Sequence, residues 1–124
     1  MSETRIRLTV GNTALTATLL DNDSSRDFMA LLPLDLTLTD YAGTEKVSDL
    51  PRRLSTTDAP AGIDPDVGDI TYYAPWGNLA IFYRDFGYSR GLVRLGTLDR
   101  DTELLAGLDG ETSATIELMP DAGP

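Results

Sequence analysis

The sequence predicts a mainly β domain, a closed or nearly closed antiparallel barrel with one clear helix and a short second helical turn. Segments of alternating apolar and polar residues recur along the chain, turn-forming Gly, Pro and Asn residues separate them, and one stretch has helical spacing. Seven or eight such strands leave fewest unpaired edges when they close into a barrel. The 124 residues form one domain, 1–124, long enough to bury a core without disulfides.

The first two strands form a hairpin. Apolar and polar residues alternate on both sides of the dipeptide Gly11-Asn12. A Gly at the first turn position suits a type II′ turn. Pairing across this turn makes one face almost wholly apolar. The opposed pairs are Val10 with Thr13, Leu8 with Leu15, and Ile6 with Ala17.

A single helix follows the hairpin. Ser24 and Ser25 are candidate N-cap residues, and Asp27 falls in the predicted first turn, where negative charge suits the helix dipole. Pro33 ends the helix. Its buried face has the spacing i, i+3, i+4 and consists of Phe28, Leu31 and Leu32.

The rest of the chain is predicted to be strands, a long loop and one helical turn. Residues 49–68 carry three prolines and two glycines with little periodicity, which indicates a surface loop. Asp101 opens the helical turn at about 101–107. The strands are at about 34–39, 45–48, 69–75, 79–84, 91–98 and 112–118, the last with Ala114, Ile116 and Leu118 facing inward.

The composition excludes several kinds of chemistry. Without cysteine or histidine, the chain can form no disulfide, thiolate nucleophile, Ser-His-Asp triad or His-based zinc site. Asp64, Asp66 and Asp69 lack the regular spacing and terminal Glu of a calcium hand. We therefore expect no metal and no cofactor.

The charge bears on partners and location. A net charge of −10 disfavours nucleic acid and anionic membrane surfaces, and indicates a solvated acidic face or, alternatively, a surface for a cation or basic partner. No apolar run approaches the roughly 20 residues of a membrane span. The first residues lack a signal-peptide pattern, so we expect a cytoplasmic protein. The sequence leaves the oligomeric state open.

Aromatic residues concentrate between positions 68 and 96. This stretch holds the only tryptophan, four of the five tyrosines and two of the three phenylalanines. Rigid aromatic surface beside Gly, Pro and Asn turns indicates a core hairpin and the rim of a pocket. Alternation assigns Leu79, Ile81 and Tyr83 to the core. The candidate ligand-binding residues are Tyr73, Trp76, Asn78, Phe82 and Tyr88.

Some of these candidates have structural alternatives. Trp76, in a Pro-Trp-Gly turn, caps the barrel or forms a stacking platform, and Asn78 satisfies turn backbone groups or contacts a ligand. Phe86 and Tyr88 flank Gly87, and we expect one to pack and the other to be exposed.

Two segments resemble the cyclophilins. LLDNDSSRDFMALLP resembles their passage from the second strand into the first helix, and YYAPWGNLAIFY resembles a loop that feeds a strand with adjacent aromatic residues. The longer segment GDITYYAPWGNLAIFYRDFGYS, together with LPRRLS, is similar to small, single-domain bacterial cyclophilin-like proteins. The resemblance covers nearly the whole chain and implies a cyclophilin-like β-barrel.

The resemblance also implies a test for prolyl isomerase activity. Active members present an Arg from a strand, with a Gln and commonly a His around the proline pocket. Here there is no His, and Thr37 and Thr39 occupy the third strand instead of an Arg. Only Phe82 carries over as a pocket wall. Arg52 and Arg53 are the candidates for a substitute catalytic donor from the loop.

We therefore predict a cyclophilin-like binding domain whose aromatic groove holds a small molecule or an extended, Xaa-Pro-containing peptide, with weak or no prolyl isomerase activity. Isomerisation needs a donor held rigidly beside the twisting imide, which a long loop supplies poorly. Two alternatives stay open. One is an active isomerase that uses Arg52 or Arg53, and the other is a protein-interaction module that docks a partner through exposed aromatic residues or a sheet edge.

Overall fold

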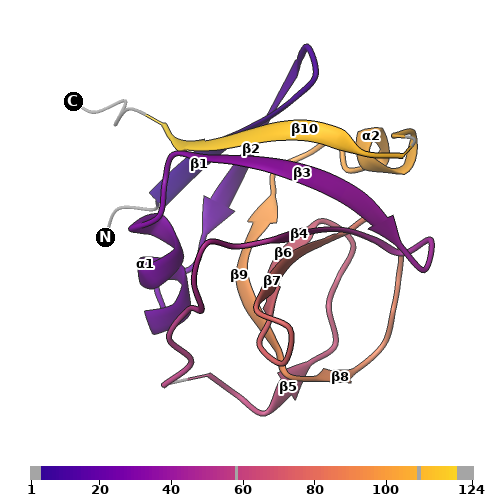
Figure 1. Ribbon diagram of the computed structural model, residues 1–124. Helices are drawn as coiled ribbons and strands as arrows, with labels where there is room; N and C mark the ends of the chain where they lie inside the picture. Colours follow the sequence, from indigo (N-terminus) through magenta and orange to yellow (C-terminus); the bar gives the residue numbers. More distant parts are fainter. Residues whose placement is uncertain (1–3, 58, 109, 120–124) are drawn as a thin grey trace.

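The computed structural model describes residues 4–57, 59–108 and 110–119. Eight strands form its body: β1 (Thr4–Val10), β2 (Thr13–Leu19), β3 (Leu34–Tyr41), β4 (Glu45–Asp49), β6 (Asp69–Tyr73), β7 (Asn78–Phe82), β9 (Leu92–Leu98) and β10 (Thr112–Leu118). They close in the order β1-β10-β3-β4-β7-β6-β9-β2. Every neighbouring pair is antiparallel, so the predicted barrel is confirmed (Figure 1).

Four short elements complete the structure. The strands β5 (Gly62–Ile63) and β8 (Ser89–Arg90) pair with each other, apart from the barrel. The helices α1 (Asp23–Met29) and α2 (Glu103–Ala106) lie at opposite ends of the barrel in Figure 1. Neither helix, within the described residues, has the length and apolarity that crossing a membrane requires.

The first hairpin has the predicted register. Val10 pairs with Thr13, and Leu8 with Leu15, across the turn. Gly11 has a φ of +58°, a conformation that Gly adopts without steric cost. The alternation of apolar residues therefore fixed both the pairing and the buried face.

The predicted N-cap of α1 is wrong by two or three residues. Asn22 is the N-cap, and its side-chain oxygen accepts the Ser25 N–H at 2.8 Å. Ser24 and Ser25 lie inside the helix and are fully buried. Their hydroxyls donate to the carbonyls of Ser55 and Leu95, at 2.6 and 2.7 Å, so they tie the helix to its surroundings instead of capping it.

The helix also ends earlier than predicted. Its last residue is Met29, so Leu31 and Leu32 lie in the turn that follows, partly buried against the core. Their N–H groups donate to Phe28 and Met29, which tightens the chain before Pro33. Asp27 is consequently in the last turn, not the first.

Two details near the C-terminal end differ from the prediction. Thr102, not Asp101, is the N-cap residue of α2. Ala114 and Ile116 are buried as predicted, but Leu118 is 45% exposed. The pairing of β10 with β3 ends at Ile116, so no β3 residue covers Leu118.

The long loop is more ordered than its sequence suggests. Leu54 is buried, and its N–H donates to the phenol oxygen of Tyr72 at 3.1 Å. Ser55 donates its N–H to Asp27 and its hydroxyl to Asp23 on α1. The first half of the loop therefore packs onto the helix, and the second half contributes β5.

Buried apolar residues form two clusters. The larger fills the barrel and includes Leu79 and Ile81 of β7, with Tyr83 partly buried against it. The smaller comprises Ala80, Phe82 and Leu92, with Val47, Ile63 and Tyr73 packed around them. Because side chains alternate along a strand, the smaller cluster lies on the outer face of the barrel. Every residue of β7 is consequently buried, on one face or the other.

Candidate functional site

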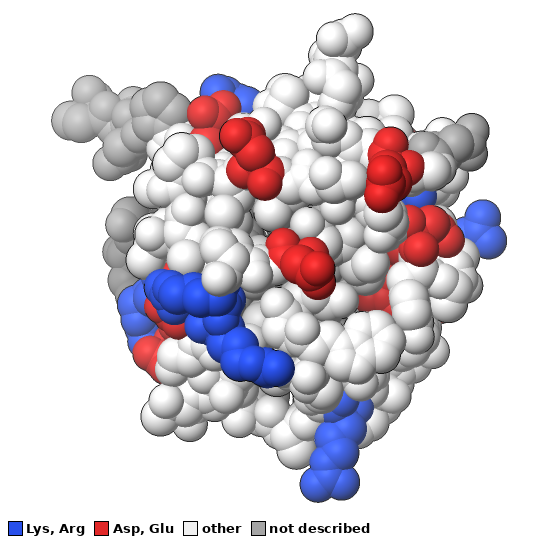
Figure 2. Space-filling view, in the orientation of Figure 1, with Lys and Arg blue, Asp and Glu red and all other residues white. Residues whose placement is uncertain are grey.

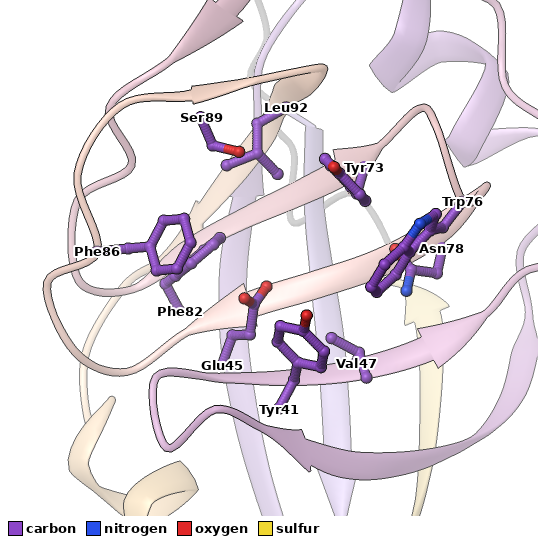
Figure 3. Close-up of a pocket in the computed structure, with 10 residues that line it drawn as sticks. All are labelled: Tyr41, Glu45, Val47, Tyr73, Trp76, Asn78, Phe82, Phe86, Ser89 and Leu92. Carbon is purple, nitrogen blue, oxygen red and sulfur yellow. The ribbon is translucent and has the colours of Figure 1, made fainter.

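A small cavity lies on this outer face. Cross-strand partners share a face of a sheet, and β4 pairs with β7 so that Glu45 faces Phe82 and Val47 faces Ala80. Side chains from the hairpin β6–β7, the end of β3 and the segment around β8 enclose the space above them (Figure 3). We call this cavity the outer pocket. It is lined by Tyr41, Glu45, Val47, Tyr73, Trp76, Asn78, Phe82, Phe86, Ser89 and Leu92.

The outer pocket accommodates one small chemical group. Its volume is about 110 Å³. Pockets that enclose whole drug-sized ligands measure about 300–1,000 Å³, and an apolar cavity of about 150 Å³ binds benzene. The pocket therefore suits a side chain or one end of a larger molecule.

Aromatic rings form one wall of the pocket. Trp76 packs edge-on against both Tyr41 and Tyr73, with ring centroids 5.6 and 5.3 Å apart and interplanar angles of 82° and 83°. Phe86 packs on Phe82 at 5.5 Å on the opposite side. Trp76 is nevertheless 57% exposed, so its indole stands at the mouth of the pocket as a platform.

The turn that carries Trp76 is held from behind. Arg53 donates to the carbonyl of Ala74 at 2.7 Å and packs along Gly77, which has a φ of +69°. Gly91 also touches this turn, and a Cβ there would lie 2.7 Å from Cδ of Pro75. The platform thus depends on close contacts that favour Gly at both positions.

Asn78 is the most unusual polar residue of the pocket. It is 7% exposed, and its Oδ1 is buried without a hydrogen-bond partner within the described structure. Such an oxygen costs about 1–3 kcal/mol of desolvation energy. In Figure 3 the Asn78 amide lies beneath the indole of Trp76. An N–H or O–H group entering the pocket would remove this deficit.

Glu45 places a buried carboxyl group at the centre of the pocket. It is 7% exposed, and in Figure 3 its carboxyl group points into the cavity between Phe82 and Tyr41. Burial, and to a lesser degree the negative charge of Asp40, raises the pKa of Glu45 from 4.5 to about 7. Glu45 therefore changes its charge near neutral pH.

A polar cluster next to the pocket fixes the charge of Asp40. Hydrogen bonds from the Tyr83 phenol, the Gly43 N–H and Lys46 lower the pKa of Asp40, against the opposing effect of burial. The Lys46 ammonium lies 3.3 Å from Asp40 and donates to the Leu108 carbonyl at 3.0 Å. The Asp40 carboxylate is thus anionic and paired. The Glu45 carboxyl group, by contrast, forms no hydrogen bond or ion pair with a described residue.

The structure brings together four of the five residues that the sequence proposed as ligand-binding. Tyr73, Trp76, Asn78 and Phe82 line the outer pocket. Tyr88 does not line it and is 64% exposed, while its neighbour Phe86 packs into the wall.

The candidate catalytic arginines point elsewhere. Arg52 forms a two-pronged salt bridge with Asp27, with bonds of 3.0 and 2.8 Å, which lowers the pKa of that carboxyl. Arg53 braces the turn of Trp76 from outside. Neither guanidinium lines the outer pocket, and neither does any described residue of the loop 49–68.

Sequence reasoning missed Glu45 and Tyr41. The two residues pair across the turn between β3 and β4, where the chain gives only a short polar segment as a signal. The pairing of Glu45 with Phe82 joins strands that are distant in the sequence, so no local pattern indicated it.

The acidic loop holds no metal cluster within the described residues. Asp69 is buried and accepts hydrogen bonds from Arg94 at 2.7 Å and Thr97 at 3.0 Å. It also accepts the Asp66 N–H at 2.8 Å. These contacts give Asp69 a structural role at the start of β6.

Comparison with known proteins identifies the family and the fold of the chain. The sequence pattern of the Cyclophilin-like family matches residues 8–117, which includes every barrel strand from within β1 to nearly the end of β10. The chain belongs to this family. The match identifies the family and the fold of this domain. It does not identify what the outer pocket binds.

A solved structure shares the arrangement of the whole domain. A hypothetical protein from Archaeoglobus fulgidus, known from its solution structure, superposes with a TM-score of 0.69 at 16% sequence identity. The likeness covers 94% of this chain and 95% of that one, and it concerns the fold. None of the curated proteins matches the chain.

Proposed function

We propose that this cyclophilin-like domain is a binding module. Its outer pocket holds one group of a small molecule or of an extended peptide, and the domain has weak or no prolyl isomerase activity. The observation that carries the proposal is the buried Asn78 oxygen without a partner, inside a pocket walled by aromatic rings. A buried polar atom left unpaired costs stability, and a ligand donor offsets that cost.

The position of the arginines supports binding over isomerisation. Rotation about an Xaa-Pro bond faces a barrier of about 18–20 kcal/mol, and catalysis needs a donor preorganised at the imide. Arg52 is engaged by Asp27, and Arg53 by the Ala74 carbonyl. No Lys or Arg is found among the described residues that line the pocket.

An NMR titration of labelled protein with a panel of Xaa-Pro peptides tests this proposal. Recording exchange between cis and trans peptide signals during the same titration separates binding from catalysis. We expect shifts at Tyr73, Trp76 and Phe82 with some ligands and no accelerated exchange. Accelerated exchange that disappears in Arg52→Ala or Arg53→Ala would support the isomerase instead. An absence of shifts with peptides and with the small ligands described below would contradict the binding module.

A further inference from the structure

Resting on this binding function, we propose a chemical class for the ligand. The outer pocket binds an alkylammonium group that keeps at least one N–H. Aromatic rings surround the cation, the Glu45 carboxylate acts as its counter-ion, and the Asn78 amide oxygen accepts its N–H.

The aromatic wall offers ring surface to a cation. Trp76 stands nearly perpendicular to both Tyr41 and Tyr73, so the three rings present faces and edges in different directions around one corner of the pocket. The negative face of an aromatic ring attracts cations, and indole does so most strongly. An alkylammonium group also buries its carbon atoms against such rings.

Glu45 supplies the counter-charge. Of the ten described residues that line the pocket, it alone is ionisable as a carboxylate, and no Lys or Arg accompanies it. The other titratable lining groups are the phenols of Tyr41 and Tyr73. The nearby Asp40 carboxylate already has two partners, because Lys46 forms an ion pair with it and the Tyr83 phenol donates a hydrogen bond to it. A cation in the pocket would thus be the direct partner of the Glu45 charge.

Asn78 sets the requirement for an N–H. Its buried oxygen needs a donor, which a quaternary ammonium ion lacks. Asn78 and Trp76 line the same pocket, and the indole above it is more than half exposed (Figure 3). A tertiary, secondary or primary ammonium group satisfies the ring faces, the carboxylate and the amide together.

The charge of the whole chain favours the approach of a cation. The net charge is −10, and Figure 2 shows acidic side chains spread singly over one face of the molecule, not gathered into one patch. Such a distribution raises the local concentration of cations without creating a second specific site.

The test uses Trp76, the only tryptophan of the chain, as a reporter inside the pocket. Its fluorescence is titrated at about pH 8 with three probes of similar shape: trimethylammonium, tetramethylammonium and tert-butanol. The first is a cation with one N–H, the second a cation without one, and the third a neutral molecule with one O–H. Sodium chloride keeps the ionic strength constant, and trimethylammonium stays protonated because alkylamines titrate near lysine.

We expect trimethylammonium to bind about tenfold or more tightly than tert-butanol, and several-fold more tightly than tetramethylammonium. Its affinity falls several-fold between about pH 8 and pH 5.5, as Glu45 takes up a proton. The preference over tert-butanol falls several-fold in Glu45→Gln, which leaves only the attraction of the aromatic rings. It persists in Glu103→Gln, which removes the same charge from the exposed surface of α2.

Asn78→Leu separates the amide from the carboxylate. In this variant the preference for trimethylammonium over tetramethylammonium should shrink, because one of the two N–H acceptors of the pocket is gone and only the Glu45 carboxylate remains. Its preference for both cations over tert-butanol should remain, because Glu45 is intact.

Several results would overturn the inference. Equal or tighter binding of tert-butanol to the wild-type protein would show an apolar pocket, which leaves the binding module standing and removes the cation. A cation preference that is as large in Glu45→Gln as in the wild-type protein would place the cation away from Glu45. If no probe and no Xaa-Pro peptide changes the fluorescence of Trp76 or the NMR spectrum, the binding module itself fails.

A second comparison identifies the source of the ammonium group. A short capped peptide with one dimethyl-lysine is compared with free dimethylbutylammonium, which carries the same head group. Tighter binding of the peptide indicates contacts with an extended chain along the rim, and equal binding indicates a free amine. Either result supports the cation site, and binding of neither compound contradicts it.

Discussion

The two faces of β7 differ in what they bury. The inner face presents Leu79 and Ile81 to the barrel, where they meet aliphatic side chains from the other strands. The outer face presents Asn78 and Phe82 to the outer pocket, where they meet aromatic rings and the Glu45 carboxyl group. Both faces are equally shielded from water, since every residue of the strand is buried.

On the proposed function, this difference separates the residues that stabilise the fold from the residues that bind the ligand. Aliphatic burial on the inner face contributes free energy to folding. On the outer face, the buried carboxyl of Glu45 and the unpaired amide of Asn78 reduce that free energy. The outer face therefore costs folding stability, and its aromatic rings leave a cavity open. We infer that this face serves a ligand.

Truncation of a side chain on the inner face should destabilise the domain without changing its ligand specificity. Ile81→Ala removes three carbons from a fully buried side chain and should lower the free energy of unfolding by about 2–5 kcal/mol. The fraction that stays folded should bind trimethylammonium within about twofold of wild type, because Ile81 faces away from the pocket. Urea unfolding and Trp76 fluorescence measure the two quantities. A large loss of affinity at unchanged stability would contradict the division of the two faces.

Replacing Glu45 by the neutral Gln should stabilise the protein relative to wild type at neutral and alkaline pH, but not at acidic pH. The folded state holds the Glu45 proton with a pKa of about 7, against 4.5 for an unperturbed Glu. The stability from this bound proton is complete below about pH 4.5, decreases as the pH rises, and is lost above about pH 7. Glu45→Gln should therefore gain about 2–3 kcal/mol over wild type at about pH 8 and almost nothing at pH 4.

Urea unfolding at a series of pH values measures this effect. Glu103→Gln serves as the control, because Glu103 is exposed and its substitution should change stability little at any pH. A gain in Glu45→Gln that is the same at every pH would mean that the carboxyl group titrates normally in the folded state.

Two asparagines give a matched comparison of structural and pocket amides. Asn22 caps α1 and donates to the Arg94 carbonyl at 3.1 Å, so Asn22→Leu should cost about 1–2 kcal/mol. Asn78→Leu replaces an amide whose oxygen is unpaired by a side chain of similar shape. Because that unpaired oxygen is removed, the variant should be as stable as the wild type or more stable by up to about 1–3 kcal/mol. Thermal unfolding of both variants decides the point, and an Asn78→Leu cost above that of Asn22→Leu would give Asn78 a structural role.

The smallest effect is expected at Arg52. Its guanidinium is held by Asp27 on α1, away from the outer pocket. Arg52→Ala should leave the affinity for trimethylammonium and for any Xaa-Pro peptide that binds within about twofold of wild type. A marked loss of peptide exchange or affinity in this variant, with the fold intact by circular dichroism, would favour the loop-arginine isomerase.

Local patterns were sufficient to predict much of the fold. The period-two alternation around Gly11 fixed the register of β1 and β2. The same alternation separated Leu79 and Ile81 from Phe82, and so placed Phe82 on the pocket side. These predictions succeeded because strand periodicity depends on neighbours in the sequence.

The remaining features depend on contacts between distant segments. Ser24 and Ser25 looked like caps, but Asn22 takes that role because both serine hydroxyls donate to carbonyls outside the helix. Glu45 looked like an ordinary polar strand residue, and its burial comes from side chains far along the chain, such as Trp76 and Phe86. No local pattern reports the pKa shift that this enclosure causes.

The most direct test of the account follows the Glu45 carboxyl carbon by NMR as the pH is varied, with and without saturating trimethylammonium. We predict a midpoint near 7 for the free protein, and a midpoint lowered by about one unit or more in the complex, because a bound cation favours the carboxylate. A midpoint near 4.5 in the free protein, or one that trimethylammonium leaves unchanged, would contradict the assignment of the outer pocket as a site for an alkylammonium ligand.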